Sequence, residues 1–484
     1  MNSSLGMINA FDPSAASALD ADEKEMIARR QRVLGPSYRL FYQHPVHIVR
    51  GEGVWLYDKA GRKYLDAYNN VPSVGHCHPH VVQAVARQMA VLNTHTRYIG
   101  DEVLDYAERL IATFPAVLDQ VMFTCTGSEA NDLALRVAKN ATGGTGIIVT
   151  RLAYHGITET VSGISPSLGA NSPLGPHVYL VDAPFSPAQA GAAEKVGPRF
   201  ADGVRTALAQ MEADGVKPAA LIFDTIFSSD GVFADPPGFI AEAIAAVRAK
   251  GGLFITDEVQ PGFGRTGEAF WGFLRHGIEP DIVTMGKPMG NGYPVAAMVA
   301  RHEVLADFGA RSRYFNTFGG SSAAMAAAAA VLDVIESEKL QDNALKTGRM
   351  IQDGLRDLAS RYPIISDVRG AGLFIGVEIA KNADGFPEIV DGSGGSRPEV
   401  DLELGECHLD RIVVGAVGRQ QQKPCALCAD CVLGRFALMA GEIVAVDDVT
   451  WMKGRYELGF DVGLEYCAAH RCINDPGGQR DRRA

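Results

Sequence analysis

Long apolar runs are missing from this sequence of 484 residues. No window reaches the roughly 18 to 20 consecutive apolar residues that a helix needs to cross a bilayer. The alanine-rich run 322–335 is shorter and contains Asp333, so it predicts a buried helix instead. The N-terminus also lacks the basic and apolar regions of a secretory signal. We therefore expect no membrane-spanning segment and a cytoplasmic location.

An excess of basic residues is also missing. The chain has 45 lysines and arginines against 57 aspartates and glutamates, a net charge of −12 with an isoelectric point near 5.5. This balance favours solubility and argues against a broad affinity for nucleic acid or for anionic membranes. The composition, 47% hydrophobic and 21% charged, is typical of globular proteins. The length indicates about two to three domains.

Cysteine is scarce before residue 400, where only Cys77 and Cys125 occur. This scarcity suits a reducing compartment, because disulfides form mainly in oxidising ones. The remaining cysteines lie close to the C-terminus, at positions 407, 425, 428, 431, 467 and 472.

What the sequence does contain is a regular alternation of strand-like and helix-like segments. Residues 20–34 predict a short amphipathic helix, and 46–68 predict a small β-meander, because short alternating runs are separated by turn residues. Further strand-like apolar runs occur at 121–125, 146–150, 178–181, 219–225, 253–257, 281–286 and 294–300. Helical patterns lie between them, which predicts an α/β fold with a largely parallel sheet covered on both faces by helices.

Two of the strand-like runs end at residues that can carry chemistry. The run 253–256 delivers Asp257 to its carboxyl end, and the run 282–285 delivers Lys287 to its own. Because open α/β sheets bind ligands in the crevice beyond these ends, we expect the two side chains to meet there. A lysine can form a Schiff base with pyridoxal phosphate, and an acid can keep the pyridine nitrogen protonated. The pair therefore predicts a pyridoxal-phosphate site.

The segment around Gly127 and Ser128 predicts an anion site. A buried strand, 121–125, turns there into a helix whose apolar positions recur at helical spacing. Free N–H groups and the positive end of the helix dipole would point outward together. A plain helix cap without a ligand is the alternative, but beside Asp257 and Lys287 the segment favours a phosphate.

Two further patterns resemble ligand sites but lack the expected context. The glycines of 262–267 match the G-x-G-x-x-G pattern of dinucleotide-binding proteins, yet no sustained helical pattern follows them. His76, His78 and His80 alternate as in some metal sites, but a polar loop leading into a helix is the simpler interpretation. We expect neither a dinucleotide nor a metal.

Taken together, the motifs resemble those of class III (subgroup II) pyridoxal-phosphate-dependent aminotransferases of fold type I. The matching segments follow the order of that family and cover residues from about 40 to 380: VGHCHPHVV, LNTHTRY, GSEANDLALR, AYHG, TDEVQPGFGRTG, DIVTMGKPMGNGYPVA, YFNTFGGS and DVRGAGLFIGVEI. The resemblance is strongest to the branch of mitochondrial alanine–glyoxylate aminotransferase and the ethanolamine-phosphate phospho-lyases. It implies a large domain over 70–320, and a small α+β domain formed by 1–69 together with 321–380 and the residues that follow.

The resemblance also implies roles at the cofactor. Lys287 would bind pyridoxal phosphate covalently and then carry a proton between substrate and cofactor, while Asp257 would pair with the pyridinium nitrogen. A cationic, partly desolvated site would lower the pKa of such a lysine, as the chemistry requires. The other implied cofactor-binding residues are Val259 and Tyr154 on the ring faces, Gln260 at the ring hydroxyl, Gly127 and Ser128 at the phosphate, and His155.

Three more residues are implied as partners of a second subunit or of the substrate. Thr317 would reach the phosphate bound by a neighbouring subunit, because the active site of this family is shared across a dimer. We therefore expect a homodimer or a larger homo-oligomer. Arg97 would meet a substrate carboxylate, with a surface salt bridge as the alternative. Asp224 takes the place of a family glutamate that interacts with an arginine on the substrate side of the site.

The C-terminal region, 381–484, departs from the family. The paired prolines of the family are missing from this region, and so is a long amphipathic helix. Residues 384–399 have a linker-like composition. The cysteines could bind zinc or a cluster, although the run at 425, 428 and 431 lacks the usual ligand set. A divergent appendage is a second interpretation. We favour a third, in which the region is out-of-frame translation of the usual ending.

The expected activity is transamination, in which an amine or amino acid donates nitrogen to the cofactor and a keto acid such as pyruvate or glyoxylate takes it up. Phosphate elimination from an amino-alcohol phosphate is the alternative within the same family. A different class of function is a cofactor-binding protein that the aberrant C-terminus has inactivated.

Overall fold

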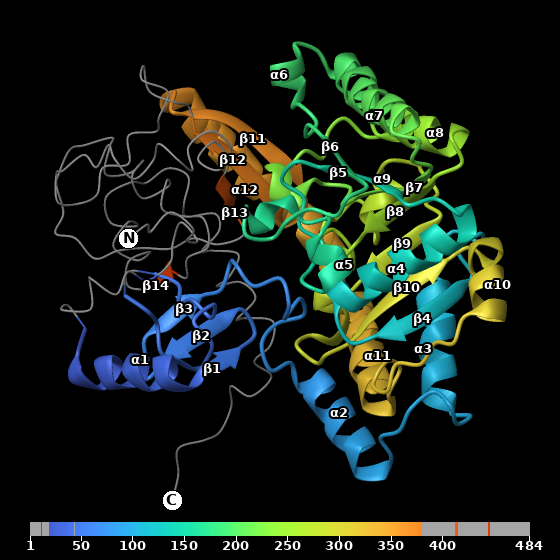
Figure 1. Ribbon diagram of the computed structural model, residues 1–484. Helices are drawn as coiled ribbons and strands as arrows, with labels where there is room; N and C mark the ends of the chain where they lie inside the picture. Colours follow the sequence, from blue (N-terminus) through green and yellow to red (C-terminus); the bar gives the residue numbers. More distant parts are fainter. Residues whose placement is uncertain (1–10, 12–18, 43, 380–411, 415–443, 446–484) are drawn as a thin grey trace, which may run out of the picture.

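A seven-stranded sheet forms the centre of the computed structural model, which describes residues 11, 19–42, 44–379, 412–414 and 444–445 (Figure 1). The strand order is β4 (Gln120–Thr124), β10 (Ala296–Ala300), β9 (Ile282–Met285), β8 (Leu253–Asp257), β7 (Pro218–Phe223), β5 (Gly146–Thr150) and β6 (Val178–Val181). Strand β10 runs antiparallel to both of its neighbours, whereas the pairs from β9 to β6 are parallel. The predicted α/β fold with a largely parallel sheet is confirmed.

Helices cover both faces of this sheet. The helices of this part of the chain are α2 (Pro79–Val91), α3 (Asp101–Ile111), α4 (Gly127–Thr142), α5 (Glu159–Ser162), α6 (Pro187–Ala190), α7 (Val196–Ala213), α8 (Ala241–Ala249), α9 (Gly272–Arg275), α10 (His302–Arg311) and α11 (Ser322–Ser337). In β7, Ala220 and Ile222 belong to the core that contains α4 and α10, while Leu221 and Phe223 belong to the core of α7 and α8. Since successive side chains of a strand point to opposite faces, these helix pairs lie on opposite sides of the sheet.

The alanine-rich segment forms α11, which is buried against α2, α3 and the sheet. Asp333, the acidic residue inside this run, lies on the partly exposed side of the helix. Its carboxylate oxygens are 2.8 Å from Nε2 of His80 and 2.8 Å from Nη2 of Arg109. An acidic residue therefore fits in an otherwise buried helix. Neither α11 nor another helix of the described ranges is long and apolar enough to cross a membrane.

Residues before 70 form a helix and a small antiparallel sheet, as predicted. The elements are α1 (Ala21–Val33), β1 (Ile48–Glu52), β2 (Trp55–Asp58) and β3 (Lys63–Leu65). Helix α1 begins at Asp20, whose side chain accepts from the N–H of Glu23 in a reciprocal cap. An ion pair of 2.7 Å between Lys59 and Asp22 joins α1 to the strands, beside which it lies in Figure 1.

After α11 the chain continues into the elements expected for a second part of the small domain. They are α12 (Leu340–Arg361), β11 (Ile365–Ala371), β12 (Phe374–Ile379), β13 (Ile412–Val414), which pairs with β12, and β14 (Val444–Ala445), which pairs with β3. The domain boundaries 1–69, 70–320, 321–380 and 381–484 stay a prediction. The cysteines between 407 and 472, on which the metal interpretation depends, lie outside the described residues.

The two patterns that resembled ligand sites make ordinary packing and surface contacts. A Cβ at Gly267 would lie 2.5 Å from the backbone nitrogen of Leu345, so the glycine lets this loop approach α12 closely. Each alternating histidine has its own acidic partner: His76 with Asp66 at 2.6 Å, His78 with Glu338 at 3.1 Å and His80 with Asp333 at 2.8 Å. The three rings therefore make separate contacts rather than facing a common centre.

Candidate active site

Three ionisable side chains lie where neighbouring parallel strands of the large sheet end. Asp257 is the last residue of β8, Asp224 directly follows β7, and Lys287 lies two residues beyond β9. The register places Asp257 beside Thr284 of β9, and Asp224 one step beyond the last pair of β7 and β8. Since adjacent strands are roughly 4.8 Å apart, the sheet brings the three residues to one edge.

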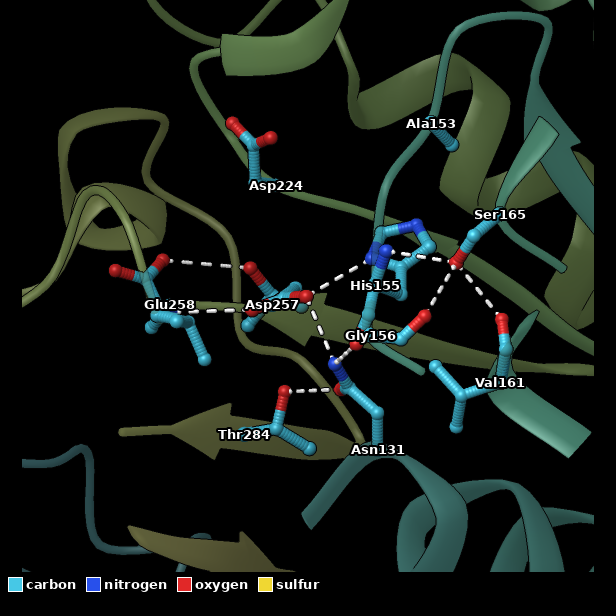
Figure 2. A network of polar contacts seen from close by, with 12 residues as sticks. Asn131, Ala153, His155, Gly156, Val161, Ser165, Asp224, Asp257, Glu258 and Thr284 are labelled. Carbon is cyan, nitrogen blue, oxygen red and sulfur yellow. Dashed lines mark hydrogen bonds and ion pairs between the residues drawn. The ribbon is translucent and has the colours of Figure 1, made fainter. Parts of the chain in front are cut away.

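Asp257 is buried and held by three nitrogen groups (Figure 2). Its Oδ2 accepts a hydrogen bond from Nδ2 of Asn131 at 2.9 Å and lies 2.8 Å from Nδ1 of His155. Its Oδ1 accepts from the backbone N–H of Val259 at 3.1 Å. The contacts at both oxygens together fix the orientation of the carboxylate.

A second layer of polar groups holds these partners in place, and the sequence prediction missed it. Thr284 Oγ1 donates to Asn131 Oδ1 at 2.6 Å, and Asn131 Nδ2 also donates to the carbonyl oxygen of His155 at 2.8 Å. Ser165 Oγ accepts from the N–H of His155 at 3.0 Å and donates to the carbonyl of Val161 at 2.7 Å. The sequence signal for these residues was weak, since Thr284 and Ser165 are single polar residues between apolar neighbours, and Asn131 lies among other polar residues at the start of a helix.

Lys287 begins a short 3-10 helix, η5 (Lys287–Gly290), and is half-buried. Burial lowers the pKa of its amine, because desolvation disfavours the charged form, while the charges of Asp257 and then Asp224 act in the opposite direction. The net shift is downward, so a larger fraction of the amine is neutral near physiological pH than for an exposed lysine. A neutral amine can act as a nucleophile and as a base.

The N-terminus of α4 faces the same edge. Thr126 caps the helix by accepting from the N–H of Glu129 at 3.1 Å, and Glu129 Oε2 accepts from the N–H of Thr126 at 3.2 Å. The first N–H groups of a helix have no intrahelical acceptor. The cap therefore satisfies the third of them and leaves those of Gly127 and Ser128 for an anion.

Glycines allow the helix end, the loops and the strand ends to approach one another. A Cβ at Gly286, the residue before Lys287, would lie 3.2 Å from the backbone nitrogen of Gly127. A Cβ at Gly127 would lie 3.0 Å from Cγ2 of Val259. Gly156 has a φ of +135°, and its Cβ would lie 2.3 Å from Oγ of Ser128. The candidate phosphate site, Val259 and the lysine loop are thus direct neighbours.

Asp224 is buried, and its own loop satisfies its carboxylate. Oδ1 accepts from the N–H groups of Ile226 at 3.1 Å and Ser228 at 3.0 Å, and Oδ2 accepts from Oγ of Ser228 at 2.8 Å. Burial, followed by the charges of Asp257 and Asp230, raises the pKa of Asp224 to about 6, against the lowering effect of the hydrogen bonds. The residue therefore changes charge near neutral pH, beside Lys287.

The remaining predicted cofactor residues lie around this centre. The pKa of Tyr154 is raised by partial burial and by the charge of Asp257. Gln260 Oε1 accepts a hydrogen bond from Nδ2 of Asn70, a residue of the loop before α2. Val259, between Asp257 and Gln260, is half-buried. These side chains follow directly from the ends of β5 and β8.

Arg97 and Thr317 are both exposed at the surface. The guanidinium of Arg97 stacks over the ring of Phe315 at 3.8 Å, and Thr317 follows on the same exposed loop. Over the described ranges, neither residue forms a hydrogen bond or ion pair with Asp257 or Lys287. The loop of Thr317 nevertheless reaches the start of α4, because Nδ2 of Asn316 donates to Oε2 of Glu129 at 3.5 Å.

Comparison with known proteins points to one family. Residues 40–393 match the family model of class-III aminotransferases. A Drosophila melanogaster protein named alanine–glyoxylate aminotransferase 2-like is 40% identical over 375 residues, 74% of this chain and 74% of its own. Ethanolamine-phosphate phospho-lyase homolog 1 of Caenorhabditis elegans is 36% identical over 396 residues, 78% of this chain and 85% of its own. A solved phospholyase from Arthrobacter in complex with phosphoethanolamine is similar with a TM-score of 0.72 and 41% identity, over 78% of this chain and 87% of its own.

Proposed function

The chain belongs to the class III aminotransferase family, and we propose that it transfers an amino group from an amine or amino acid to a keto acid such as pyruvate or glyoxylate. Enzymes of this family depend on pyridoxal phosphate, so the predicted family, fold type and cofactor are confirmed. The observation that carries the proposal is the desolvated amine of Lys287 at the same sheet edge as the carboxylate of Asp257.

The residues at this edge fit the cofactor. Two N–H groups at the start of α4 lack intrahelical acceptors and suit a phosphate. The close approach of Gly286 to Gly127 leaves little room for a side chain between the lysine loop and that helix end. An amine and a carboxylate complete the donor set. When bound, the cofactor supplies an electron-withdrawing ring that stabilises negative charge on a substrate carbon.

Each residue of the centre has a proposed task. Nζ of Lys287 would hold the cofactor covalently and accept the proton from the substrate carbon that bears the nitrogen. The carboxylate of Asp257 would hold a proton at the ring nitrogen, and its buried contacts with Asn131 and His155 fix it for that task. The lowered pKa of Lys287 supports its role as a base near neutral pH.

Four neighbouring residues would orient the cofactor. Gly127 and Ser128 would bind its phosphate, while Val259 and Tyr154 would cover the ring faces. Gln260, whose side chain points to Asn70, would bind the ring hydroxyl. These assignments rest on the family resemblance together with the proximity of the residues to Asp257.

Phosphate elimination from an amino-alcohol phosphate is the second candidate. It is favoured by the likeness to the Arthrobacter phospholyase in complex with phosphoethanolamine, which is more similar to this chain than the ornithine aminotransferase of Toxoplasma gondii, at 41% against 28% identity. Both reactions begin with loss of a proton from the carbon that bears the nitrogen. They differ in whether a phosphate leaves the neighbouring carbon or a proton returns.

We propose a homodimer or larger homo-oligomer in which Thr317 serves a neighbouring subunit. Large apolar side chains are exposed close to the loop of Thr317: Ile99 is 99% exposed, Phe318 70% and Tyr98 65%. Tyr98 and Ile99 line one surface pocket. Apolar side chains exposed in this way favour a protein partner. The scarcity of cysteine before residue 400 supports a cytoplasmic location, which cell fractionation would test.

A product assay distinguishes the candidates. Purified protein loaded with pyridoxal phosphate is incubated with an amine and pyruvate or glyoxylate, or with ethanolamine phosphate and no keto acid. Transamination yields alanine or glycine and needs the keto acid, whereas elimination releases inorganic phosphate without it. Lys287→Ala should abolish both products. A loaded wild-type protein that forms neither product with any amine of a broad panel would contradict the proposal and favour an inactivated cofactor-binding protein.

A further inference from the structure

A buried amide, Asn131, has all of its hydrogen-bonding groups directed at the candidate centre (Figure 2). The residue is 0% exposed in the first turns of α4. One hydrogen of Nδ2 is donated to Asp257 Oδ2 at 2.9 Å and the other to the carbonyl of His155 at 2.8 Å. Its Oδ1 accepts from Thr284 Oγ1 at 2.6 Å. Burying an amide is costly unless its partners are all present, and here they are.

The direction of this amide is determined by its surroundings. If the amide were rotated by half a turn, its oxygen would face a carboxylate oxygen and a carbonyl oxygen, which are both acceptors. The hydroxyl of Thr284 donates to Oδ1 in the present orientation and stabilises it. Asn131 is therefore a fixed donor to Asp257, from a residue 126 positions earlier in the chain.

Counting lone pairs shows what this donor does to Asp257. A carboxylate has about four lone-pair sites, two on each oxygen. Asn131 and the Nδ1 side of His155 use those of Oδ2, and the N–H of Val259 uses one on Oδ1. One site on Oδ1 is left for a further N–H donor. Nε2 of His155 is buried without a hydrogen-bond partner in the described ranges. The contact between Nδ1 and Asp257 is therefore the hydrogen bond that orients this imidazole ring.

We propose that Asn131, oriented by Thr284, is a positioning residue that holds Oδ2 of Asp257 and thereby directs the remaining lone pair of Oδ1 to the ring nitrogen of the cofactor. This inference rests on the proposed function and deepens it. Without the amide, the carboxylate can rotate, and its interaction with a protonated ring nitrogen weakens. Because a hydrogen bond to a charged group is among the stronger ones in proteins, we expect an effect of about tenfold to a hundredfold on cofactor affinity.

Four variants test the proposal. Asn131→Leu keeps the approximate shape and removes both donors, and Thr284→Val removes the group that orients the amide. Thr284→Ser keeps the hydroxyl and serves as the conservative rescue. Asn140→Leu is the matched control, because Asn140 lies on the same helix and donates to Asp307 at 2.7 Å, away from the centre.

Two readouts are used, the dissociation constant of pyridoxal phosphate from the apoprotein and the pH dependence of the visible spectrum of the loaded protein. Asn131→Leu should raise the dissociation constant about tenfold to a hundredfold. It should also lower the pH at which the visible spectrum is halfway through its transition. Thr284→Val should shift both quantities in the same directions by smaller amounts. Thr284→Ser and Asn140→Leu should match the wild type in both.

The outcomes separate the inference from the proposed function. If folded Asn131→Leu binds the cofactor within twofold of the wild type with an unchanged spectral midpoint, the inference is wrong. Should that variant fail to fold, Thr284→Val decides, and wild-type values for it overturn the inference equally. A wild-type protein that does not bind the cofactor through Lys287, as judged by borohydride reduction and mass spectrometry, would instead overturn the proposed function.

Discussion

Replacing Asp224 by asparagine removes a buried ionisable group while preserving most of its hydrogen bonds. The N–H groups of Ile226 and Ser228 both reach Oδ1, at 3.1 and 3.0 Å, so an amide oxygen can accept them. Oγ of Ser228 donates to Oδ2 at 2.8 Å, and a hydroxyl can accept from an amide nitrogen at the same place. The N–H of Ser228 also donates to Oδ2 at 3.0 Å, and this second contact is lost when Oδ2 becomes an amide nitrogen. Because that loss does not change with pH, the pH dependence of the variant's stability still isolates the effect of the charge.

The size of the effect follows from the pKa of Asp224. Burial first, and then the charges of Asp257 and Asp230, raise it from 3.8 to about 6. The native state therefore binds more protons than the unfolded state between these values, and the free energy of unfolding falls as pH rises through them. At about 1.4 kcal/mol per pKa unit, two units amount to about 3 kcal/mol. The advantage of Asp224→Asn over the wild type should grow by about this amount between pH 4 and pH 7.

Urea unfolding of the apoprotein at a series of pH values from about 4 to about 8 measures this difference. Asp353→Asn is the matched control, because the side chain of Asp353 is 75% exposed on α12 and pairs with Arg356 at the surface. Its curve should run parallel to that of the wild type. If the Asp224→Asn curve is also parallel to the wild type, the carboxyl does not titrate in this range and the reasoning from burial is refuted.

Three further predictions concern the rate–pH profile, cofactor binding and the action of Thr317 between subunits. Asp224→Asn should also move the acid limb of the rate–pH profile to lower pH, because the Asp224 charge raises the pKa of Lys287, and an unmoved limb would contradict this. Gly156→Ala should weaken pyridoxal-phosphate binding at least about tenfold, since its Cβ would lie 2.3 Å from Oγ of Ser128 at a φ of +135°. Titration of the apoprotein checks this, and wild-type affinity in the variant would show that the loop relaxes freely. Mixed dimers of Thr317→Ala and Lys287→Ala should regain one intact site if Thr317 acts across the interface, whereas no recovery in the product assay would place its action within its own chain.

Much of the fold follows from local patterns in the sequence. Runs such as 147–149 and 219–223 are apolar without interruption, which is typical of a parallel sheet whose two faces are covered by helices. Because parallel strands end at the same edge, two residues that follow apolar runs, Asp257 and Lys287, are expected near each other without knowledge of strand order. The antiparallel direction of β10 has no such signal, since its apolar residues read the same in either direction.

The support of the site was decided by the tertiary structure alone. Asn131 and Thr284 are separated by 153 residues, and Asn131 and Asp257 by 126, yet each pair forms a hydrogen bond. Helical or strand periodicity reports which face of an element is apolar, and it carries no information about which distant polar group meets a buried one. The sequence by itself determined the chemistry available, an amine, an acid and a helix end. Only the packing of α4 against the sheet decided how the acid is held, because hydrogen bonds depend on distances that packing alone sets.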